Sequence, residues 1–262
     1  MTDQLKQHQP DSEPTQRPAA IHTKPPIKSK GSRGVLLLIG VIFAGGLCMV
    51  VAALMAGLAV LFTTLNDQRI DTVTSSGDTI FAEYFDSDDN GWVTGEFEDD
   101  LGHEEITIED GVYTVKVTAK NSVYVERNLP NHEFSDFVLT MEATPRDSET
   151  YYSYGIAFRG NDDLENYVFE FGNDGLYAVF LFSGEWTALQ DWTSSEAIKP
   201  GQTNEVTIMA VGSTLTFSVN GEQLAVVEDD TLAGGTISLV VEVFEAGQSA
   251  IVDFDSLVIR EP

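Results

Sequence analysis

Cysteine is almost absent from this chain. Its 262 residues include a single cysteine, Cys48, so no disulfide can form within the chain. The roughly 200 residues that follow Cys48 are enough to bury a hydrophobic core without covalent cross-links. A disulfide-stabilised fold is therefore excluded.

Basic residues are also scarce. The chain has 14 Lys and Arg against 42 Asp and Glu, a net charge of −28 and a pI near 4.1. Residues 1–65 contain six basic and three acidic residues, whereas residues 66–262 contain eight basic and 39 acidic residues. Because so acidic a segment repels nucleic acid and anionic lipid, nucleic acid is not an expected partner.

Histidine is too rare to suggest histidine-based chemistry. Of the four histidines, His8 and His22 lie in the first 33 residues, and only His103 and His132 lie in the acidic segment. A histidine-centred triad or a multi-histidine zinc site therefore has little support.

Charged side chains, Asn, Gln, Ser, Thr and Pro are all absent from Val35–Phe62, a run of 28 residues. A helix of this length extends about 42 Å, more than the roughly 30 Å hydrocarbon core of a bilayer. We therefore expect residues 35–62 to form a transmembrane helix. Under the positive-inside rule, four basic residues just before it predict a cytoplasmic N-terminus: Lys24, Lys28, Lys30 and Arg33.

A cleaved signal peptide is the alternative, but the apolar run is about twice the length of a signal core and no clear cleavage site follows it. We therefore expect an uncleaved anchor, a linker over residues 63–77 and an extracytoplasmic domain over 78–262. Two small-residue pairs in the span, Ala52 with Ala56 and Ala53 with Gly57, make a homodimer through this helix a candidate.

Residues 1–33 are rich in proline and nearly free of large apolar side chains. Such a composition cannot bury enough surface to offset the entropy of ordering, so we expect a disordered cytoplasmic tail. A proline-recognition motif for a cytoplasmic partner is the alternative.

From about Thr79 the apolar residues alternate with polar ones, as in half-buried strands. Turn sequences such as Asp110-Gly111 and Asn220-Gly221 separate these segments. About a dozen short strands without an amphipathic helix predict an all-β fold, a sandwich or jelly roll. The clearest inward-facing sets are Tyr113, Val115 and Val117; Phe137, Leu139, Met141 and Ala143; Leu215, Phe217 and Val219; and Ile237, Leu239, Val241 and Val243.

A series of core and turn sequences runs between Thr79 and Arg260. It comprises Phe85-Asp86 to Gly91-Trp92, Asp110-Gly111-Val112-Tyr113, Gly155 to Arg159, Asn166-Tyr167-Val168-Phe169, Asp174-Gly175-Leu176-Tyr177, Trp186, Trp192, Ile198 to Gly201 with Asn204, Val219-Asn220-Gly221 and Val252-Asp253-Phe254-Asp255. Together these sequences resemble the concanavalin A-like or laminin G-like jelly rolls. The resemblance is greatest to the bacterial 3-keto-disaccharide hydrolase domains, and extends distantly to family 16 glycosidases.

This resemblance implies a two-sheet sandwich whose concave face or loop rim binds carbohydrate, sometimes with a structural calcium ion. The absence of any Asn-x-Ser/Thr sequon from the acidic segment fits a bacterial envelope protein. The family 16 signature, Glu-x-Asp-x-(x)-Glu on one strand, has no counterpart here. The nearest run, Glu242-Val243-Phe244-Glu245, lacks the Asp and places its two glutamates on opposite faces. We therefore assign no catalytic residues and do not favour an enzyme.

The segment from Asp86 to Gly91 has the oxygen ligands of a calcium loop at alternate positions, namely Asp86, Asp88 and Asn90. The twelfth position, where an EF-hand has a bidentate Glu, is Phe97. Calcium is therefore a candidate ligand, and a simple polar turn is the alternative.

Sugars are commonly bound by an aromatic platform together with planar polar groups. Trp186, Trp192 and Tyr177 are the candidate platform. Strand alternation also predicts that Arg159 and Glu170 meet on one sheet face. The alternative is that both tryptophans belong to the core and that Arg159 and Glu170 form a cross-strand pair of small net effect.

Three functions remain open. The first is a single-pass membrane protein that displays a glycan-binding or polar-ligand-binding sandwich at the cell surface. The second is an envelope hydrolase or lyase acting on a disaccharide or polysaccharide. The third is a structural subunit that docks onto another envelope protein.

Overall fold

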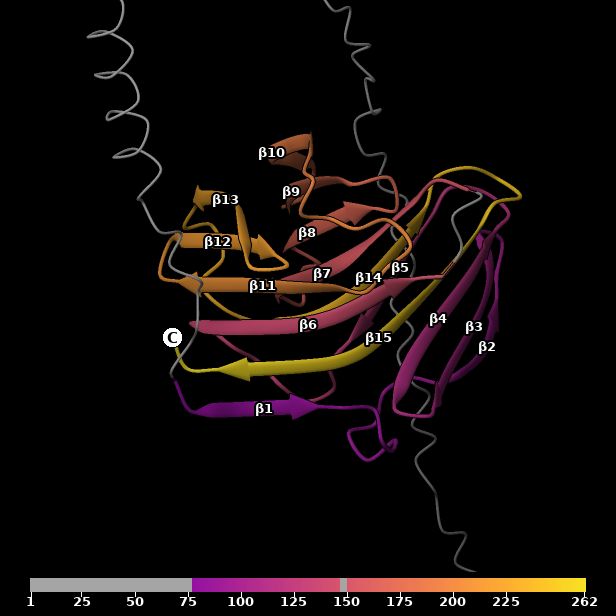
Figure 1. Ribbon diagram of the computed structural model, residues 1–262, viewed down its shortest axis with the longest axis horizontal. Coiled ribbons are helices and arrows are strands. Elements are labelled where there is room, and N and C mark those ends of the chain that lie inside the picture. Colours follow the sequence, from indigo (N-terminus) through magenta and orange to yellow (C-terminus); the bar gives the residue numbers. More distant parts are fainter. Residues whose placement is uncertain (1–76, 147–149) are drawn as a thin grey trace, which may run out of the picture.

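The computed structural model describes residues 77–146 and 150–262, which form fifteen β-strands in two antiparallel sheets. The predicted all-β sandwich is thus confirmed. Figure 1 shows the smaller sheet behind the larger one, with β7 and β14 crossing behind β6 and β15. Partners distant in sequence lie side by side, such as β6 with β15 and β7 with β14, because the chain passes repeatedly between the sheets.

The larger sheet has nine strands. Its order is β13 (Glu222–Glu228), β12 (Thr214–Val219), β11 (Asn204–Val211), β6 (Phe137–Pro145), β15 (Ser249–Arg260), β4 (Val112–Ala119), β3 (Gly102–Glu109) and β2 (Gly95–Glu98), with β1 (Thr79–Glu83) also paired to β15.

The smaller sheet has six strands. Its order is β10 (Trp186–Ser194), β9 (Leu176–Phe182), β8 (Asn166–Gly172), β7 (Tyr152–Gly160), β14 (Thr236–Val243) and β5 (Val123–Asn128).

The predicted inward-facing residues are buried in the core between the sheets. Aromatic side chains join the two layers: the Phe217 ring of β12 lies 4.9 Å from that of Phe169 on β8 and 6.1 Å from that of Phe158 on β7. Because each large aromatic removes much apolar area from water, this layer supplies a major part of the stability of the fold.

Two predicted turn sequences form tight hairpins. Asp110 and Gly111 between β3 and β4 have φ of 53° and 78°, and Asn220 and Gly221 between β12 and β13 have 52° and 78°. Two consecutive residues with positive φ are typical of the type I′ turn, which favours Asn-Gly and Asp-Gly.

The predicted tail over residues 1–33, the span over 35–62 and all of the linker over 63–77 except Gly77 lie outside the described residues. Within residues 77–146 and 150–262, no helix is long and apolar enough to cross a membrane.

Candidate functional site on the six-stranded sheet

One face of the six-stranded sheet points away from the nine-stranded sheet, and we call it the outer face. Side chains alternate along a strand, so residues between core positions point to this face. It includes Ser153 and Ala157 of β7, Glu170 of β8, and Val240 and Glu242 of β14. Their neighbours along the chain belong to the core: Tyr152, Tyr154, Ile156, Phe158, Phe169, Phe171, Leu239, Val241 and Val243.

A second, smaller apolar cluster covers part of the outer face. Ala157, Val168 and Val240 are buried there, with Tyr124 of β5 and Trp186 of β10 packed against them. The centroids of the Tyr124 and Trp186 rings are 6.0 Å apart, and the rings meet edge to face at 66°. Aromatic side chains over small aliphatic ones give this face an apolar surface of the kind that packs against a sugar ring.

Both predicted tryptophans lie at the β9–β10 end of this face. Trp186 and Trp192 each place their ring 6.0 Å from the ring of Phe180 on β9, and Trp186 is also 5.0 Å from Phe182. Both tryptophans are half-buried, and neither belongs to the core between the sheets. The structure thus brings Trp186 and Trp192 together on one surface.

Glu170 and Glu242 flank β7 on the same outer face. Glu170 pairs with Gly155 of β7, and Glu242 pairs with Ser153 on the other side of that strand. Both glutamates are buried. Two carboxylates on either side of a central strand can accept hydrogen bonds from one ligand lying across it.

The Tyr124 hydroxyl has a raised pKa because it is buried close to several carboxylates. Burial raises the pKa of Tyr124 well above its usual value, and the negative charges of Glu126, Glu170 and Glu242 raise it further. The phenol is therefore protonated at neutral pH.

Tyr151 contributes a second phenol. Its ring is stacked on Phe244 with centroids 5.1 Å apart. Burial raises the pKa of Tyr151, and the carboxylates of Asp174, Glu170 and Glu242 add to the rise. Tyr124 and Tyr151 thus stand near the same two glutamates.

Three buried polar atoms on or beside this face have no hydrogen-bond partner within the described part of the chain. They are the Ser153 hydroxyl, the Asn166 Oδ1 and the Tyr151 hydroxyl. Ser153 is fully buried and Asn166 is 7% exposed. Because buried polar groups nearly always have partners, the Ser153 and Tyr151 hydroxyls mark a place where a polar ligand would complete the hydrogen bonding. Asn166 lies at the opposite end of β8 from Gly172, the partner of Ser153, and marks a separate place.

Gly172 leaves room for Tyr151. A Cβ at Gly172 would lie 3.2 Å from the ring and 3.2 Å from the hydroxyl of Tyr151. Since Gly172 pairs with Ser153, the phenol lies close to the Ser153 position. The nearest atom to such a Cβ is Asp174 Oδ1, at 2.5 Å, so a side chain at residue 172 would displace the Asp174 carboxylate and shift the Tyr151 ring slightly.

Tyr177 is not on the outer face. It belongs to the core, 5% exposed, and its hydroxyl donates a hydrogen bond to the Leu224 carbonyl at 2.8 Å. The predicted platform therefore lacks Tyr177, since this residue is at an inward position of β9.

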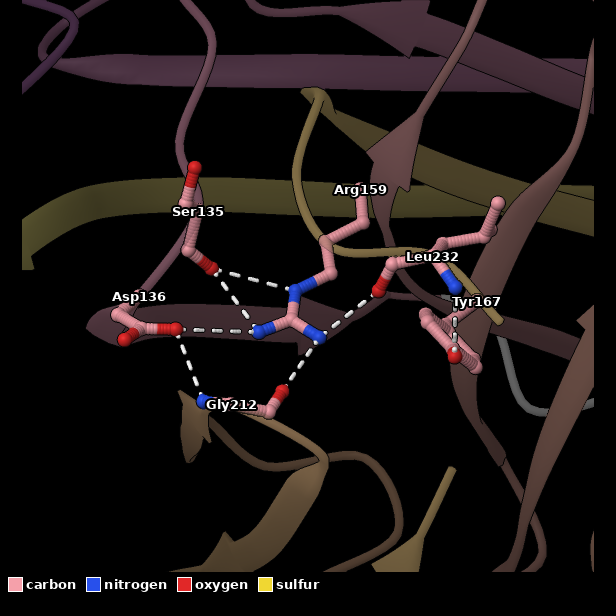
Figure 2. A network of polar contacts seen from close by, with 6 residues as sticks. All are labelled: Ser135, Asp136, Arg159, Tyr167, Gly212 and Leu232. Carbon is pink, nitrogen blue, oxygen red and sulfur yellow. Dashed lines mark hydrogen bonds and ion pairs between the residues drawn. The ribbon is translucent and has the colours of Figure 1, made fainter. Parts of the chain in front are cut away.

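Arg159 does not meet Glu170, and this expectation was wrong. Its fully buried guanidinium donates to the carbonyls of Ser135 at 3.1 and 3.2 Å, of Gly212 at 2.9 Å and of Leu232 at 2.9 Å. Asp136 completes the network at 3.4 Å, as Figure 2 shows. Arg159 therefore ties together three loops.

A β-bulge explains why alternation fails at Arg159. The register with β14 shifts so that Thr236 pairs with Gly160 and Ile237 with Phe158, which leaves Arg159 without a partner. Its φ of 53° lies in the left-handed region. An extra residue of this kind re-aims the side chain, here toward the loops beyond the end of β7.

The predicted calcium loop joins β1 to β2. Asp86 and Asp88 are exposed, whereas the Asn90 amide donates to Glu83 Oε2 at 2.6 Å. Among the described residues, no group of three or more His, Cys, Asp or Glu side chains is placed to hold a metal ion. Calcium binding by this loop stays a prediction.

Tyr124, Tyr151 and Ser153 were not predicted from the sequence. Glu242 was considered only as part of a catalytic signature, which it does not match. The available signal was a polar residue at an outward position of an otherwise apolar strand, as with Ser153 in β7 and Glu242 in β14. A strand that is apolar on both faces is covered on both faces. Isolated polar groups within such strands therefore indicate a covered polar site.

The comparisons with known proteins agree with this architecture. The model of the 3-keto-alpha-glucoside-1,2-lyase-like domain matches residues 81–260. No curated protein matches the chain at a significant level.

Solved structures of low sequence identity share the fold. A β-1,3-1,4-glucanase (lichenase) from a mouse hindgut metagenome has a TM-score of 0.55 at 14% identity, over 70% of this chain and 99% of that one. An endo-β-galactosidase from Clostridium perfringens that releases GlcNAcα1-4Gal has a TM-score of 0.52 at 10% identity, over 72% of this chain and 64% of that one. A β-1,3-glucanase from Mycobacterium marinum has a TM-score of 0.51 at 10% identity, over 71% of this chain and 100% of that one.

Proposed function

The chain belongs to the 3-keto-alpha-glucoside-1,2-lyase-like domain family, and from this membership we propose that its sandwich binds carbohydrate on the outer face of the six-stranded sheet. The observation that carries the proposal is the placement of Trp186 and Trp192 on the same face as the buried Glu170 and Glu242. A sugar offers an apolar ring face to aromatic side chains and hydroxyl groups to carboxylates.

Similar folds act on carbohydrates, which supports the proposal. Two of the proteins named above are a β-1,3-1,4-glucanase and an endo-β-galactosidase that releases GlcNAcα1-4Gal. Because a shared fold does not define an activity, the argument depends on the residues of the outer face.

A hydrolase or lyase is the second candidate function, and the carboxylate pair of Glu170 and Glu242 favours it. Glycoside hydrolysis usually requires two carboxyl groups on opposite sides of the scissile bond. Burial raises the pKa of the neighbouring Tyr151, which moves this phenol further from ionisation. A reducing-sugar or product assay on any glycan that binds would distinguish cleavage from binding.

Replacing Trp192 with alanine is expected to weaken glycan binding at least tenfold, about 1.4 kcal/mol. The substitution removes half of the aromatic pair around Phe180. A glycan array probed with the purified full-length chain identifies the ligand, and titration of that glycan then measures the affinity of wild type and variant.

Tyr84→Ala is the matched control for Trp192→Ala, because Tyr84 is 54% exposed and precedes β2, away from the outer face. The control should bind as wild type does. Unchanged affinity in a folded Trp192→Ala variant would remove this tryptophan from the site.

We also propose that residues 35–62 anchor the protein in a membrane with the tail inside and the sandwich outside. The support is the length and composition of this segment and the basic residues before it. The small-residue pairs within it suggest a homodimer as a further element of the proposal.

Protease added to intact cells tests this orientation. We expect loss of a C-terminal tag while an N-terminal tag persists in the membrane fraction. A C-terminal tag that survives, with the protein in the soluble cytosol, would contradict the proposed anchoring.

A further inference from the structure

Small residues make up the centre of the outer face, and we call this set the floor. Its members stand at outward positions of three adjacent strands: Ser153, Gly155 and Ala157 on β7, Gly172 on β8 and Ala178 on β9. All of them are buried. Since such short side chains do not cover one another, larger side chains from elsewhere must cover the floor.

Two aromatic side chains from opposite edges of the sheet meet over the floor. Tyr124 stands on β5 and Trp186 on β10, with four strands between them. On a flat sheet, the strand spacing would separate their backbones by roughly 24 Å. Their ring centroids are instead 6.0 Å apart, and both rings pack against the buried cluster that includes Ala157. The sheet therefore curls toward its outer face, and the two rings cover it.

The floor contains polar groups suited to a ligand. The Ser153 hydroxyl is fully buried and has no hydrogen-bond partner in the described part of the chain. The same is true of the buried Tyr151 hydroxyl, which lies beside Gly172. Leaving such groups unsatisfied is unfavourable, and a polar ligand on the floor would satisfy them. A ligand reaches the floor only if its cover opens.

Both covering residues belong to the strands of this sheet that separate most easily. β5 and β10 are edge strands, each with a neighbour on one side only. β10 also shifts its register with β9 between Ala188 and Gln190 and again between Gln190 and Thr193. Local opening requires the least free energy where few backbone bonds and contacts are lost. The two rings can therefore separate while the central strands stay paired.

From these observations we propose that Tyr124 and Trp186 form a gate over the floor, closed in this structure, and that a glycan reaches the floor only after the two rings separate. This inference rests on the proposed carbohydrate-binding function, because it names the conformational step that admits the ligand. The closed gate shields the apolar cluster beneath it from water when no glycan is bound.

Thiol labelling measures the opening of the gate without a ligand. In the detergent-purified full-length chain with Cys48→Ser, Val168→Cys places a thiol in the cluster beneath the gate. Val241→Cys is the matched control, since Val241 is also buried but lies in the core on the opposite face of the same sheet. With methyl methanethiosulfonate as the reagent, we expect the Val168→Cys thiol to react about tenfold faster or more, because local opening is easier than global unfolding.

Removing either ring should speed this reaction. Tyr124→Ala and Trp186→Ala should each accelerate labelling of Val168→Cys about tenfold more than labelling of Val241→Cys, whose rate corrects for any loss of global stability. Because two rings that form one gate act as a unit, the double variant should be little faster than the faster single variant. Tyr124→Phe keeps the ring and should label about as slowly as the chain with Tyr124.

Each contrary result overturns the gate. Equal labelling of Val168→Cys and Val241→Cys would show that the cluster opens only with the whole fold. Equal acceleration by Tyr124→Phe and Tyr124→Ala would show that the ring contact does not close the face. The labelling uses no glycan, so a failed gate leaves carbohydrate binding to be decided on the glycan array. If the gate opens but no glycan on the array binds, the proposed function fails and the opening is upheld.

Discussion

Replacing Arg159 with methionine is expected to lower the free energy of unfolding by about 3–5 kcal/mol, the usual range when one member of a buried charged network is removed. The change leaves the carbonyls of Ser135, Gly212 and Leu232 without the donor they share. It also leaves residue 159 in the left-handed region, where a side chain without such bonds is strained.

Urea unfolding of the wild type and the variant measures this difference. Lys116→Met is the matched control because Lys116 also pairs with a carboxylate, that of Glu105, but both side chains are exposed, 45% and 43%. Exposed pairs contribute about 0–1 kcal/mol, so the control should unfold close to wild type. If both variants lose equally little stability, the loops do not depend on Arg159.

Replacing Glu83 with alanine is expected to lower the free energy of unfolding by about 2–4 kcal/mol, since it leaves several buried donors unsatisfied. The carboxylate accepts from the backbone of Tyr84 at 2.9 Å and Phe85 at 2.7 Å, from the Asn90 amide at 2.6 Å and from the Trp92 indole at 2.9 Å. It therefore fixes the start of the β1–β2 connection.

Tryptophan fluorescence adds a local readout to the unfolding curve of Glu83→Ala. Trp92 is 2% exposed, so loosening of its indole should shift the emission toward that of a solvated tryptophan. Glu96→Ala, at an exposed position of β2, is the control and should change neither stability nor emission. An unshifted spectrum with wild-type stability would show that Glu83 does not hold this connection.

The fold was predictable because alternation and turn chemistry are local properties. The alternation of apolar and polar residues in β4 was enough to place Tyr113, Val115 and Val117 in the core. The hairpin turn at Asn220-Gly221 was predictable because Asn and Gly both tolerate the positive φ that such a turn requires. The order of the strands depends on crossovers between sheets, which no local pattern encodes.

The site was predictable only in part. Trp186, Trp192 and Glu170 lie on one face, but Arg159 was misplaced because a bulge shifts the pairing by one residue. Tyr177 was assigned to the platform because it precedes the tryptophans in a neighbouring strand, although the alternation along that strand places its side chain inward. Tyr151 and Ser153 were missed because their significance comes from the residues that β8 and β14 place on either side of β7, and β14 lies far away in the chain.

The central polar groups of the outer face project from paired strands rather than from loops. Ser153, Glu170 and Glu242 each stand within a strand that has neighbours on both sides. Their backbone positions are therefore set before any ligand arrives, and little ordering entropy remains to be lost on association. Such rigidity restricts recognition to ligands that already have the matching shape, so the protein should discriminate sharply among closely related isomers.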